Sequence, residues 1–260
     1  MQVETAGQYL FVYNAFSFTL ATMAAATLFL WLSRSQVGPA YRTALTVSGL
    51  VTAIAAYHYF RIFESWTAAY TLSGNVLTST DHPFNDAYRY VDWLLTVPLL
   101  LIELLLVMRL STQETVAKSW RLGSAAALMI VLGYPGEIAH DNGTRALFGT
   151  LATIPFLYIL WVLFRGLGES IDRQPENVRD LIRKARLLTL ASWGFYPIVY
   201  MIPYTNLSGG AVETSVQLGY TLADIVAKAG LGVLIYNIAI RKSTAEYGAH
   251  GEKGSTVGAR

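Results

Sequence analysis

The chain has 260 residues, of which 53% are hydrophobic and only 14% are charged. Soluble domains usually carry about 25% charged residues, so this composition argues against an ordinary soluble enzyme and favours a protein that uses a lipid bilayer as its solvent. The formal net charge is only +2, which gives no electrostatic footprint for nucleic acid. The chain has no cysteine, which excludes disulfides, thiol catalysis and thiolate metal sites.

Seven apolar runs are each long enough to cross a bilayer, because a helical span needs about 20 predominantly apolar residues. They cover residues 9–32, 44–62, 90–108, 122–139, 146–164, 187–204 and 216–240. The fourth run is the least apolar of them. We therefore predict an all-α fold, with a seven-transmembrane-helix bundle over residues 1–242 and a polar, disordered cytoplasmic tail over residues 243–260.

The loop charges predict how the bundle faces. Most of the 19 lysines and arginines fall in the connections after the first, third and fifth runs and in the tail, which share one side of the bilayer. The opposite side has only Arg145 in its loops. The positive-inside rule then places the N-terminus outside and the C-terminus in the cytoplasm, across the plasma (inner) membrane. The longest outer loop, residues 67–86, contains a Ser-Gly-Asn turn at 73–75 that indicates a short β-hairpin.

The third run carries two acids inside otherwise apolar sequence. Asp92 and Glu103 are separated by close to three helical turns, so they share a face and lie roughly 16 Å apart. Arg89 and Thr96 lie about one turn to either side of Asp92. A plainer interpretation is open for each charge, since Arg89 could snorkel to the interface and both acids could be interfacial. Charges inside a bilayer are costly, however, and mark function by default.

The seventh run places a lysine near the middle of the bilayer. Lys228 shares a helical face with Asp224, four residues earlier. A structural ion pair is the plainer interpretation, but such a pair gains little net stability when buried. A desolvated amine suits Schiff-base formation with an aldehyde, and the resulting cation needs Asp92 or Asp224 as its counterion, with Arg89 balancing the second negative charge. A hydrophobic aldehyde also needs an aromatic slot, for which the candidates are Trp93, Trp193, Tyr196 and Tyr200.

These motifs resemble those of the microbial (type 1) rhodopsins over the full length of the seven runs. The segment Arg-Tyr-Val-Asp-Trp-Leu-Leu-Thr-Val-Pro-Leu-Leu-Leu-Ile-Glu at 89–103 is similar to the third helix of that family. Trp-Gly-Phe-Tyr-Pro at 193–197 resembles its sixth helix, and Asp-Ile-Val-Ala-Lys at 224–228 its seventh. Asp, Thr and Glu at positions 92, 96 and 103 resemble the signature of outward proton pumps. His58-Tyr59 and Gly-Tyr-Pro-Gly-Glu at 133–137 are similar to the xanthorhodopsin and Gloeobacter-type group of these pumps.

The resemblance implies a cofactor and a role for each charged residue. It implies all-trans retinal bound to Lys228 as a protonated Schiff base, with Asp92 as counterion and proton acceptor and Asp224 as the second counterion. Glu103 is implied to be the proton donor on the cytoplasmic side. The other site residues that the resemblance implies are Arg89, Thr96, His58 as the partner of Asp92, and Trp93, Leu100, Trp193, Tyr196, Pro197 and Tyr200 around retinal. It implies no metal.

Two further positions bear on the expected pigment. Leu100 occupies a position where leucine implies green absorption in the proteorhodopsins. Gly149 stands where many relatives have a bulky aromatic residue, and in xanthorhodopsin this glycine opens a lateral window for a carotenoid antenna. A small residue for helix packing explains Gly149 equally well.

Proton release on the outer side has its own candidate residue. Glu213 is the only acid in the last outer loop, and Val216 stands where a second glutamate would be sought. We therefore do not expect early proton release by a glutamate pair.

The sequence thus predicts a light-driven outward proton pump and not an enzyme, with retinal as cofactor and a carotenoid as a candidate second chromophore. A photosensory rhodopsin that signals to a partner is the alternative, although sensors of this fold usually lack an acid at the position of Glu103. A seven-helix protein that binds no chromophore, with Lys228 as a structural ion, is a third hypothesis. The expected partners are the lipid bilayer, protons and further copies of the chain in a pentamer or trimer, and not nucleic acid.

Overall fold

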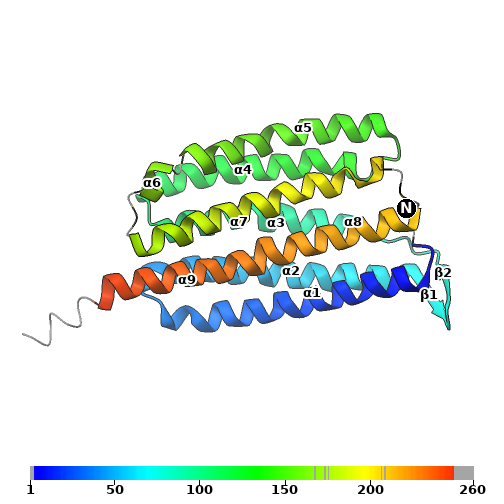
Figure 1. Ribbon diagram of the computed structural model, residues 1–260, viewed down its shortest axis with the longest axis horizontal. Helices are drawn as coiled ribbons and strands as arrows, with labels where there is room; N and C mark the ends of the chain where they lie inside the picture. The colour runs from blue at the N-terminus through cyan, green and yellow to red at the C-terminus, as the bar shows by residue number, and fades with distance from the viewer. Residues whose placement is uncertain are drawn as a thin grey trace, which may run out of the picture.

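The computed structural model describes residues 3–166, 168–172, 174, 176–205, 207 and 209–248. In this part of the chain seven long helical rods run along one axis, and a small β-hairpin lies at one end (Figure 1). The chain enters the bundle at the hairpin end, and α9 leaves it at the opposite end. Termini at opposite ends are what an odd number of spans requires.

Each of the seven predicted runs coincides with one rod, so the predicted seven-helix bundle is confirmed. Four rods are the single helices α1 (Ala6–Leu32), α2 (Arg42–Ala69), α3 (Ala87–Met108) and α4 (Thr112–Glu137). The fifth is α5 (Asn142–Trp161) with the π-helical η3 (Val162–Gly166) and the short α6 (Gly168–Asp172), and the sixth is α7 (Glu176–Tyr200). The seventh is α8 (Gly209–Asp224), the π-helical η5 (Ile225–Gly230) and α9 (Leu231–Ser243). The remaining turns are η1 (Ser33–Gln36), η2 (Pro39–Tyr41), η4 (Ile202–Tyr204) and η6 (Thr244–Gly248).

Side chains in the loops start three of the helices. Thr5 accepts a hydrogen bond from the backbone N–H of Gln8, and Ser111 accepts one from Glu114, both at 3.2 Å. Asp141 accepts one from Thr144 at 2.7 Å, and this bond lowers the pKa of the Asp141 carboxyl. Such caps satisfy the first amide groups of a helix, which have no partner within it.

The predicted hairpin is present between α2 and α3. Strands β1 (Tyr70–Ser73) and β2 (Val76–Ser79) pair antiparallel, with Tyr70 opposite Ser79. Gly74 has a φ of 62°, a left-handed conformation that glycine adopts at no steric cost. The tight turn therefore depends on the glycine that the sequence supplies at this position.

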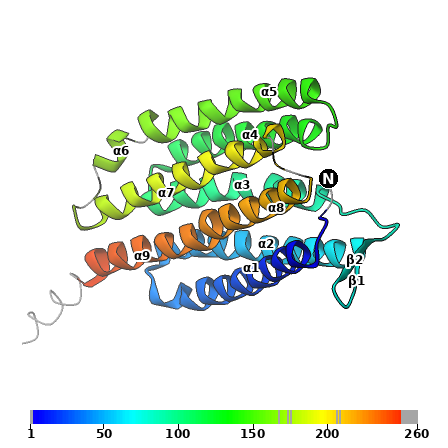
Figure 2. The same ribbon diagram turned by 45° about the vertical axis from the view of Figure 1, so that its right-hand side comes forward.

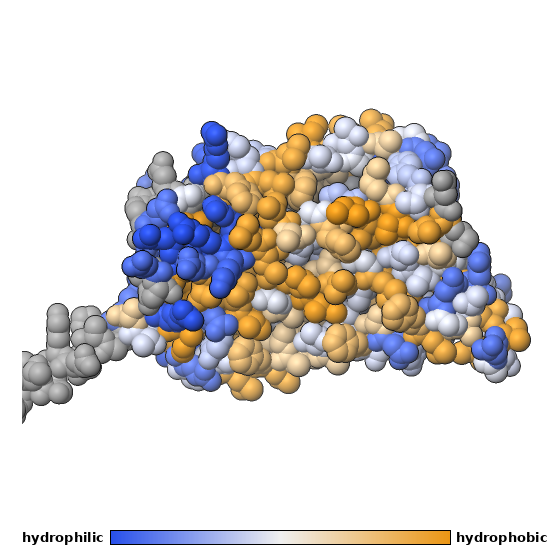
Figure 3. Space-filling view, viewed as in Figure 1, coloured by the Kyte–Doolittle hydropathy of each residue, from blue (hydrophilic) through white to orange (hydrophobic). Residues whose placement is uncertain are grey.

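Length and apolar composition allow five segments of the described chain to cross a membrane, namely Ala6–Gln36, Ala87–Met108, Thr112–Glu137, Asn142–Arg165 and Gly209–Glu246. Among these five α4 is the least apolar, but the expectation that the fourth run is the least apolar of all seven is wrong, because α2 and α7 are not among the five. The rods α2 and α7 are of similar length but more polar, and α7 opens with a charged stretch over residues 176–186. Figure 3 shows an apolar band around the middle of the bundle, with hydrophilic side chains gathered at both ends.

Two of the rods are more deeply buried than the others. Figures 1 and 2 agree that α4 and α5 lie on one side of the bundle and α1 and α2 on the other, with α3, α7, α8 and α9 between them. Accordingly 61% of the apolar part of α3 is buried, against 17% for α4 and for α5. The buried rods are the ones that carry the four charged residues singled out in the third and seventh runs.

The tail predicted from residue 243 lies only partly within the described residues. The seventh rod ends at Ser243, and η6 adds one π-helical segment to Gly248. Residues 249–260 lie outside the described part of the chain.

Candidate functional site

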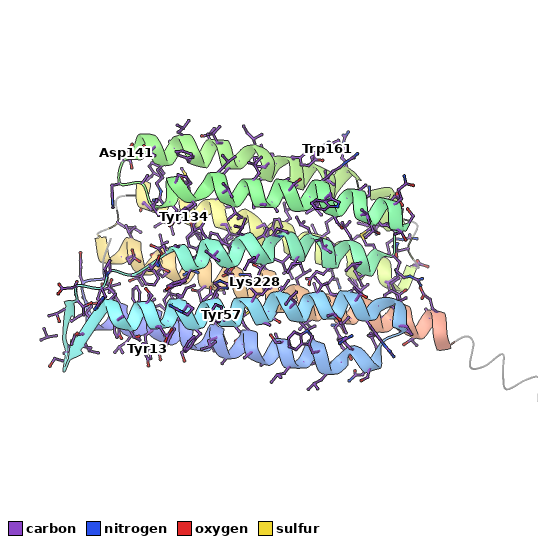
Figure 4. All side chains as sticks on the ribbon, turned by 180° about the vertical axis from the view of Figure 1, so that it is seen from behind. Tyr13, Tyr57, Tyr134, Asp141, Trp161 and Lys228 are labelled. Carbon is purple, nitrogen blue, oxygen red and sulfur yellow. The ribbon has the colours of Figure 1, made fainter. Side chains whose placement is uncertain are left out.

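Lys228 holds its amine between two carboxylates near mid-length of the bundle (Figure 4). Its Nζ donates to Oδ2 of Asp92 on α3 and lies 2.9 Å from Oδ1 of Asp224 on α8. All three side chains are only 1% exposed. Lys228 belongs to the π-helical η5, a kind of segment that is rare and frequent at functional sites. The structure thus brings together the lysine and both acids that were predicted as counterions.

Asp224 is surrounded by hydrogen-bond donors. Tyr59 donates to its Oδ2 at 2.9 Å. Trp93 donates to Oδ1 at 3.1 Å through Nε1, and Tyr196 donates to the same oxygen at 2.6 Å. Bonds of this kind to a charged acceptor are stronger than those between neutral groups. Asp224 is therefore a fixed negative charge beside Lys228.

Asp92 has fewer partners. Its Oδ1 accepts no hydrogen bond from the residues that the structure describes. His58 Nδ1 lies 3.8 Å from this oxygen, but also 2.9 Å from the Ile54 carbonyl, to which it can only donate. Thr96 donates to the backbone carbonyl of Asp92 at 2.8 Å and not to its carboxylate. One carboxylate oxygen of Asp92 is therefore free to receive a proton.

Arg89 is buried, being only 2% exposed, so it does not snorkel to the interface. We expected it to balance Asp224, and it does so through Tyr59, whose hydroxyl accepts from Arg89 at 3.2 Å and donates to Asp224. Its other amine donates to Oε1 of Gln217 at 2.6 Å. Arg89 thus links the lysine site to groups nearer the hairpin end.

Gln217 connects Arg89 to two further acids. Its amide nitrogen lies 3.1 Å from Oδ1 of Asp86 and 3.0 Å from Oε1 of Glu213. Burial raises the pKa of the Asp86 carboxyl. We sought a partner for Glu213 on its own helix at Val216, whereas the acid that lies near it comes from the loop before α3. Spacing along the seventh run carries no signal for such a contact.

Glu103 has surroundings of a different kind. Its side chain is fully buried, and the one polar side chain recorded beside its carboxyl group in the described part of the chain is the hydroxyl of Ser48 on α2, which is not placed for a well-formed hydrogen bond. Leu100, Leu104 and Leu105 beside it belong to the main hydrophobic core. It is therefore not a water-exposed interfacial group. An ionised carboxylate without a partner in such surroundings costs far more than the neutral acid.

An apolar cavity of about 420 Å³ adjoins the ion cluster. The six residues predicted around retinal all line it, as does Gly149, the predicted carotenoid window. The six are Trp93, Leu100, Trp193, Tyr196, Pro197 and Tyr200. Trp93 and Tyr196, which both donate to Asp224, form the wall nearest to Lys228, and their rings meet edge to face at 5.1 Å. The size and apolar lining fit a hydrophobic polyene, because ligand pockets of this class measure about 300–1,000 Å³. Among the described residues, no group of three His, Asp or Glu side chains could hold a metal ion.

Gly149 lines the cavity and also supports its wall. A Cβ atom at this position would lie 2.8 Å from Cε1 of Tyr200, closer than real Cβ contacts come. The glycine therefore lets the Tyr200 ring pack against α5. The structure is therefore compatible with both explanations of Gly149, as a small residue for helix packing and as a window at the cavity.

Sequence reasoning missed several polar residues of the site. Tyr59, Gln217 and Tyr220 are single polar residues on apolar helices, and nothing in their spacing marks them. Glu137 and Arg145 form a second buried ion pair at 3.3 Å. Their signal was available, since an acid and an arginine eight residues apart end one apolar run and begin the next.

Comparisons with known proteins place these features in one group. The family model described as bacteriorhodopsin-like protein matches residues 12–242. The green-light absorbing proteorhodopsin of Gamma-proteobacterium EBAC31A08 is 33% identical over 236 residues, which cover 89% of this chain and 88% of that protein. Xanthorhodopsin, described as a light-driven ion pump with dual chromophore, is 55% identical with a TM-score of 0.89, over 94% of this chain and 97% of that one. The structure of thermophilic rhodopsin is 47% identical with a TM-score of 0.90, over 95% and 99%.

Proposed function

Because the chain belongs to the bacteriorhodopsin-like protein family, we propose that it is a light-driven pump that moves protons outward across the membrane, with retinal as its chromophore. It is a multi-pass membrane protein and a transporter, not an enzyme. The observation that carries the proposal is the Lys228 amine, held between Asp92 and Asp224 beside an apolar cavity.

The residues present fit retinal. Lys228 would hold it as a protonated Schiff base, and the cavity between α3, α5 and α7 would enclose its apolar chain. When bound, retinal supplies the absorption of visible light and an isomerisation that makes the proton on the Lys228 nitrogen mobile. Trp93, Trp193 and Tyr196 confine the group on the sides nearest to the lysine. Leu100 lies in the same wall, and we propose green absorption on the basis of that residue.

Asp92 is proposed to accept the proton. It touches the Lys228 nitrogen directly, and its second oxygen is free of hydrogen bonds in the described structure. Asp224 touches the same nitrogen, but donors from Tyr59, Trp93 and Tyr196 already stabilise its negative charge. Proton transfer therefore favours Asp92, while Asp224 remains the fixed counterion. His58, 3.8 Å from Asp92, is proposed to tune that acceptor.

Glu103 is proposed to return a proton to the Lys228 nitrogen. It lies on α3 about three turns from Asp92, toward the end of the bundle where α9 leaves it. An unpartnered carboxyl in apolar surroundings is suited to carry a proton until a more basic group needs it. With the acceptor on one side of the lysine and the donor on the other, each cycle moves one proton in one direction.

The direction of transport depends on the orientation of the bundle. We propose that the hairpin end faces outward and the α9 end faces the cytoplasm, because most lysines and arginines lie at the latter end. A proton that passes from Glu103 to the lysine and on to Asp92 then moves outward. The contacts that run from Asp224 through Tyr59 and Arg89 to Gln217 connect the lysine site to the buried acids Asp86 and Glu213 at the hairpin end, and we propose that the proton leaves on this side.

Light-induced pH change in a cell suspension tests the proposal. Cells that express the protein with retinal should acidify the medium on illumination, and a protonophore should abolish the signal. The variant Lys228→Ala serves as the control, because it has no amine to bind retinal, and its presence in the membrane fraction at the normal level is checked first. A preparation that shows the visible band but no acidification would contradict the pump and favour the photosensory hypothesis.

A second chromophore and an assembly belong to the same proposal. We propose a carotenoid against Gly149, which lines the cavity on the sparsely buried α5. With carotenoid added, light absorbed in the carotenoid band should drive acidification, and the same wavelengths should not do so in the protein that holds retinal alone. We also propose a homo-oligomer of three or five copies, which chemical cross-linking in native membranes would count.

A further inference from the structure

The proposed pump makes no use of one buried ion pair. Glu137 ends α4 and Arg145 lies in the first turn of α5, with 3.3 Å between Oε2 and the guanidinium. Their side chains are 9% and 5% exposed, whereas those of the Arg61–Glu64 pair on α2 are 39% and 51% exposed. Burying both charges costs desolvation that their attraction barely repays. Because the pair adds little stability, its role is sought in the groups that Glu137 and Arg145 contact.

Three tyrosines connect the pair to the apolar cavity. Tyr90 and Tyr220 donate to Oε2 of Glu137 at 3.4 Å and 3.2 Å. The guanidinium of Arg145 lies 4.6 Å above the ring of Tyr200 and donates to its carbonyl. All three tyrosines line the cavity. The two charges are thus one side chain away from whatever fills it.

The pair lies toward the hairpin end of the bundle from Lys228. Arg145 contacts Tyr200, which packs against Gly149 of α5, whereas the tyrosines that donate to Glu137 contact the ring of Trp93 at 4.9 Å and 5.0 Å. The lysine is on the seventh rod near mid-length, whereas Asp141, in the loop between Glu137 and Arg145, lies at one end of the bundle beside α5 (Figure 4). The cavity extends from Trp93 and Tyr196, beside the lysine site, to Gly133 of α4 and Gly149 of α5. A polyene attached at Lys228 and enclosed by this cavity would have its free end toward these helices.

We propose that Glu137 and Arg145 are a tuning pair, which sets the absorption maximum of the pigment from the free end of the cavity, with Glu137 cancelling the charge of Arg145. Light moves the positive charge of a protonated polyene imine from the nitrogen toward the far end. A cation near that end opposes this shift and raises the excitation energy, whereas a carboxylate there lowers it. Charges act strongly at such a range because the surroundings are apolar. The inference rests on the proposed function, since it presupposes retinal at Lys228.

The absorption maxima of the purified, retinal-loaded variants test the tuning pair. Glu137→Gln leaves Arg145 charged, because a guanidinium does not lose its proton in proteins, and the maximum should move to shorter wavelength. The double variant Glu137→Gln with Arg145→Gln should return most of the way to the unmodified pigment. Glu137→Asp, which keeps the charge, and Glu64→Gln, which breaks the exposed pair, should leave the maximum in place. An unshifted Glu137→Gln pigment, or a double variant shifted as far as the single one, would overturn the proposal.

Glu137→Gln leaves the buried charge of Arg145 without a partner, which can prevent folding, so a second variant tests the same proposal. Arg145→Gln removes the cation and, at alkaline pH, leaves the ionised carboxylate near the cavity. Its maximum should move to longer wavelength, opposite to Glu137→Gln, and a shift to shorter wavelength or none would overturn the proposal. Failure of the unmodified protein to form any visible band would instead refute the proposed function itself.

Discussion

Asp92 and Glu103 lie on the same face of α3, and both are buried, yet their surroundings have nothing in common. Asp92 touches a lysine, has a histidine 3.8 Å away and lies within a cluster of hydrogen-bonded polar side chains. Glu103 is fully buried on a leucine-rich part of α3, and the one polar side chain recorded beside it in the described chain is the uncharged hydroxyl of Ser48. One helix thus holds two carboxyl groups under opposite conditions. The polar site favours an ionised acid ready to receive a proton, and the apolar site favours an acid that already carries one.

The comparison shows how a single helix can give transport a direction. Donor and acceptor are the same chemical group, so chemistry alone would not distinguish them. The difference comes from the neighbouring rods, because Lys228 and Asp224 of the seventh rod face only the Asp92 end. Changing either environment should change the role of the acid inside it.

The largest effect is expected from Lys228→Ala. This change removes the only amine between the two carboxylates, so retinal cannot attach and the visible band should be lost. The spectrum of the purified protein after addition of retinal measures this. A retinal-derived band that survives removal of free retinal would show that retinal is not attached through Lys228.

Asp92→Asn should come next in size. An amide cannot accept the proton, so light-driven acidification should fall to the level of cells without the protein while a shifted visible band remains. The matched control is Asp180→Asn, which changes an exposed acid on α7 and leaves the acceptor intact. Outward transport by Asp92→Asn at the normal rate would show that the free oxygen of this carboxylate has no role in transport.

Glu103→Gln should leave the dark pigment nearly intact but slow its recovery after a flash. Loss of a positioned proton donor typically costs about 100-fold or more in rate. Flash spectroscopy of the deprotonated pigment measures the effect, and Glu114→Gln, which changes an exposed acid on α4, is the control. Equal recovery rates in the two variants would place the donor elsewhere.

Tyr59→Phe should have the smallest effect of the four, and on stability first. The hydroxyl that is removed joins Arg89 to Asp224, and a buried polar group left without its partner costs about 1–3 kcal/mol. Thermal unfolding of the protein without added retinal measures the loss, with Tyr57→Phe on the exposed side of α2 as control. Equal unfolding temperatures would mean that the polar cluster does not depend on this link.

The sequence predicts much of this arrangement because a bilayer leaves so few choices. Apolar length predicts the rods, and a charge inside an apolar run stands out, which is why Asp92, Glu103, Asp224 and Lys228 are recognisable from the sequence alone. Uncharged polar partners give no such signal, so Gln217 and the link that Tyr59 makes between Arg89 and Asp224 emerge only from the fold. Asp86 is not predicted for another reason, since it meets Gln217 and the neighbourhood of Glu213 from a loop that is distant in the sequence.

Time-resolved infrared difference spectroscopy tests the contrast between the two acids most directly. A protonated carboxyl group absorbs at a C=O frequency that the ionised form lacks. We expect one such band to appear as the Lys228 nitrogen loses its proton, and to be absent from Asp92→Asn. A second band should be present in the dark, disappear as the nitrogen regains its proton, and be absent from Glu103→Gln. If the Glu103 carboxyl shows no loss of its C=O band at any stage, the account of α3 as a helix with a donor and an acceptor is wrong.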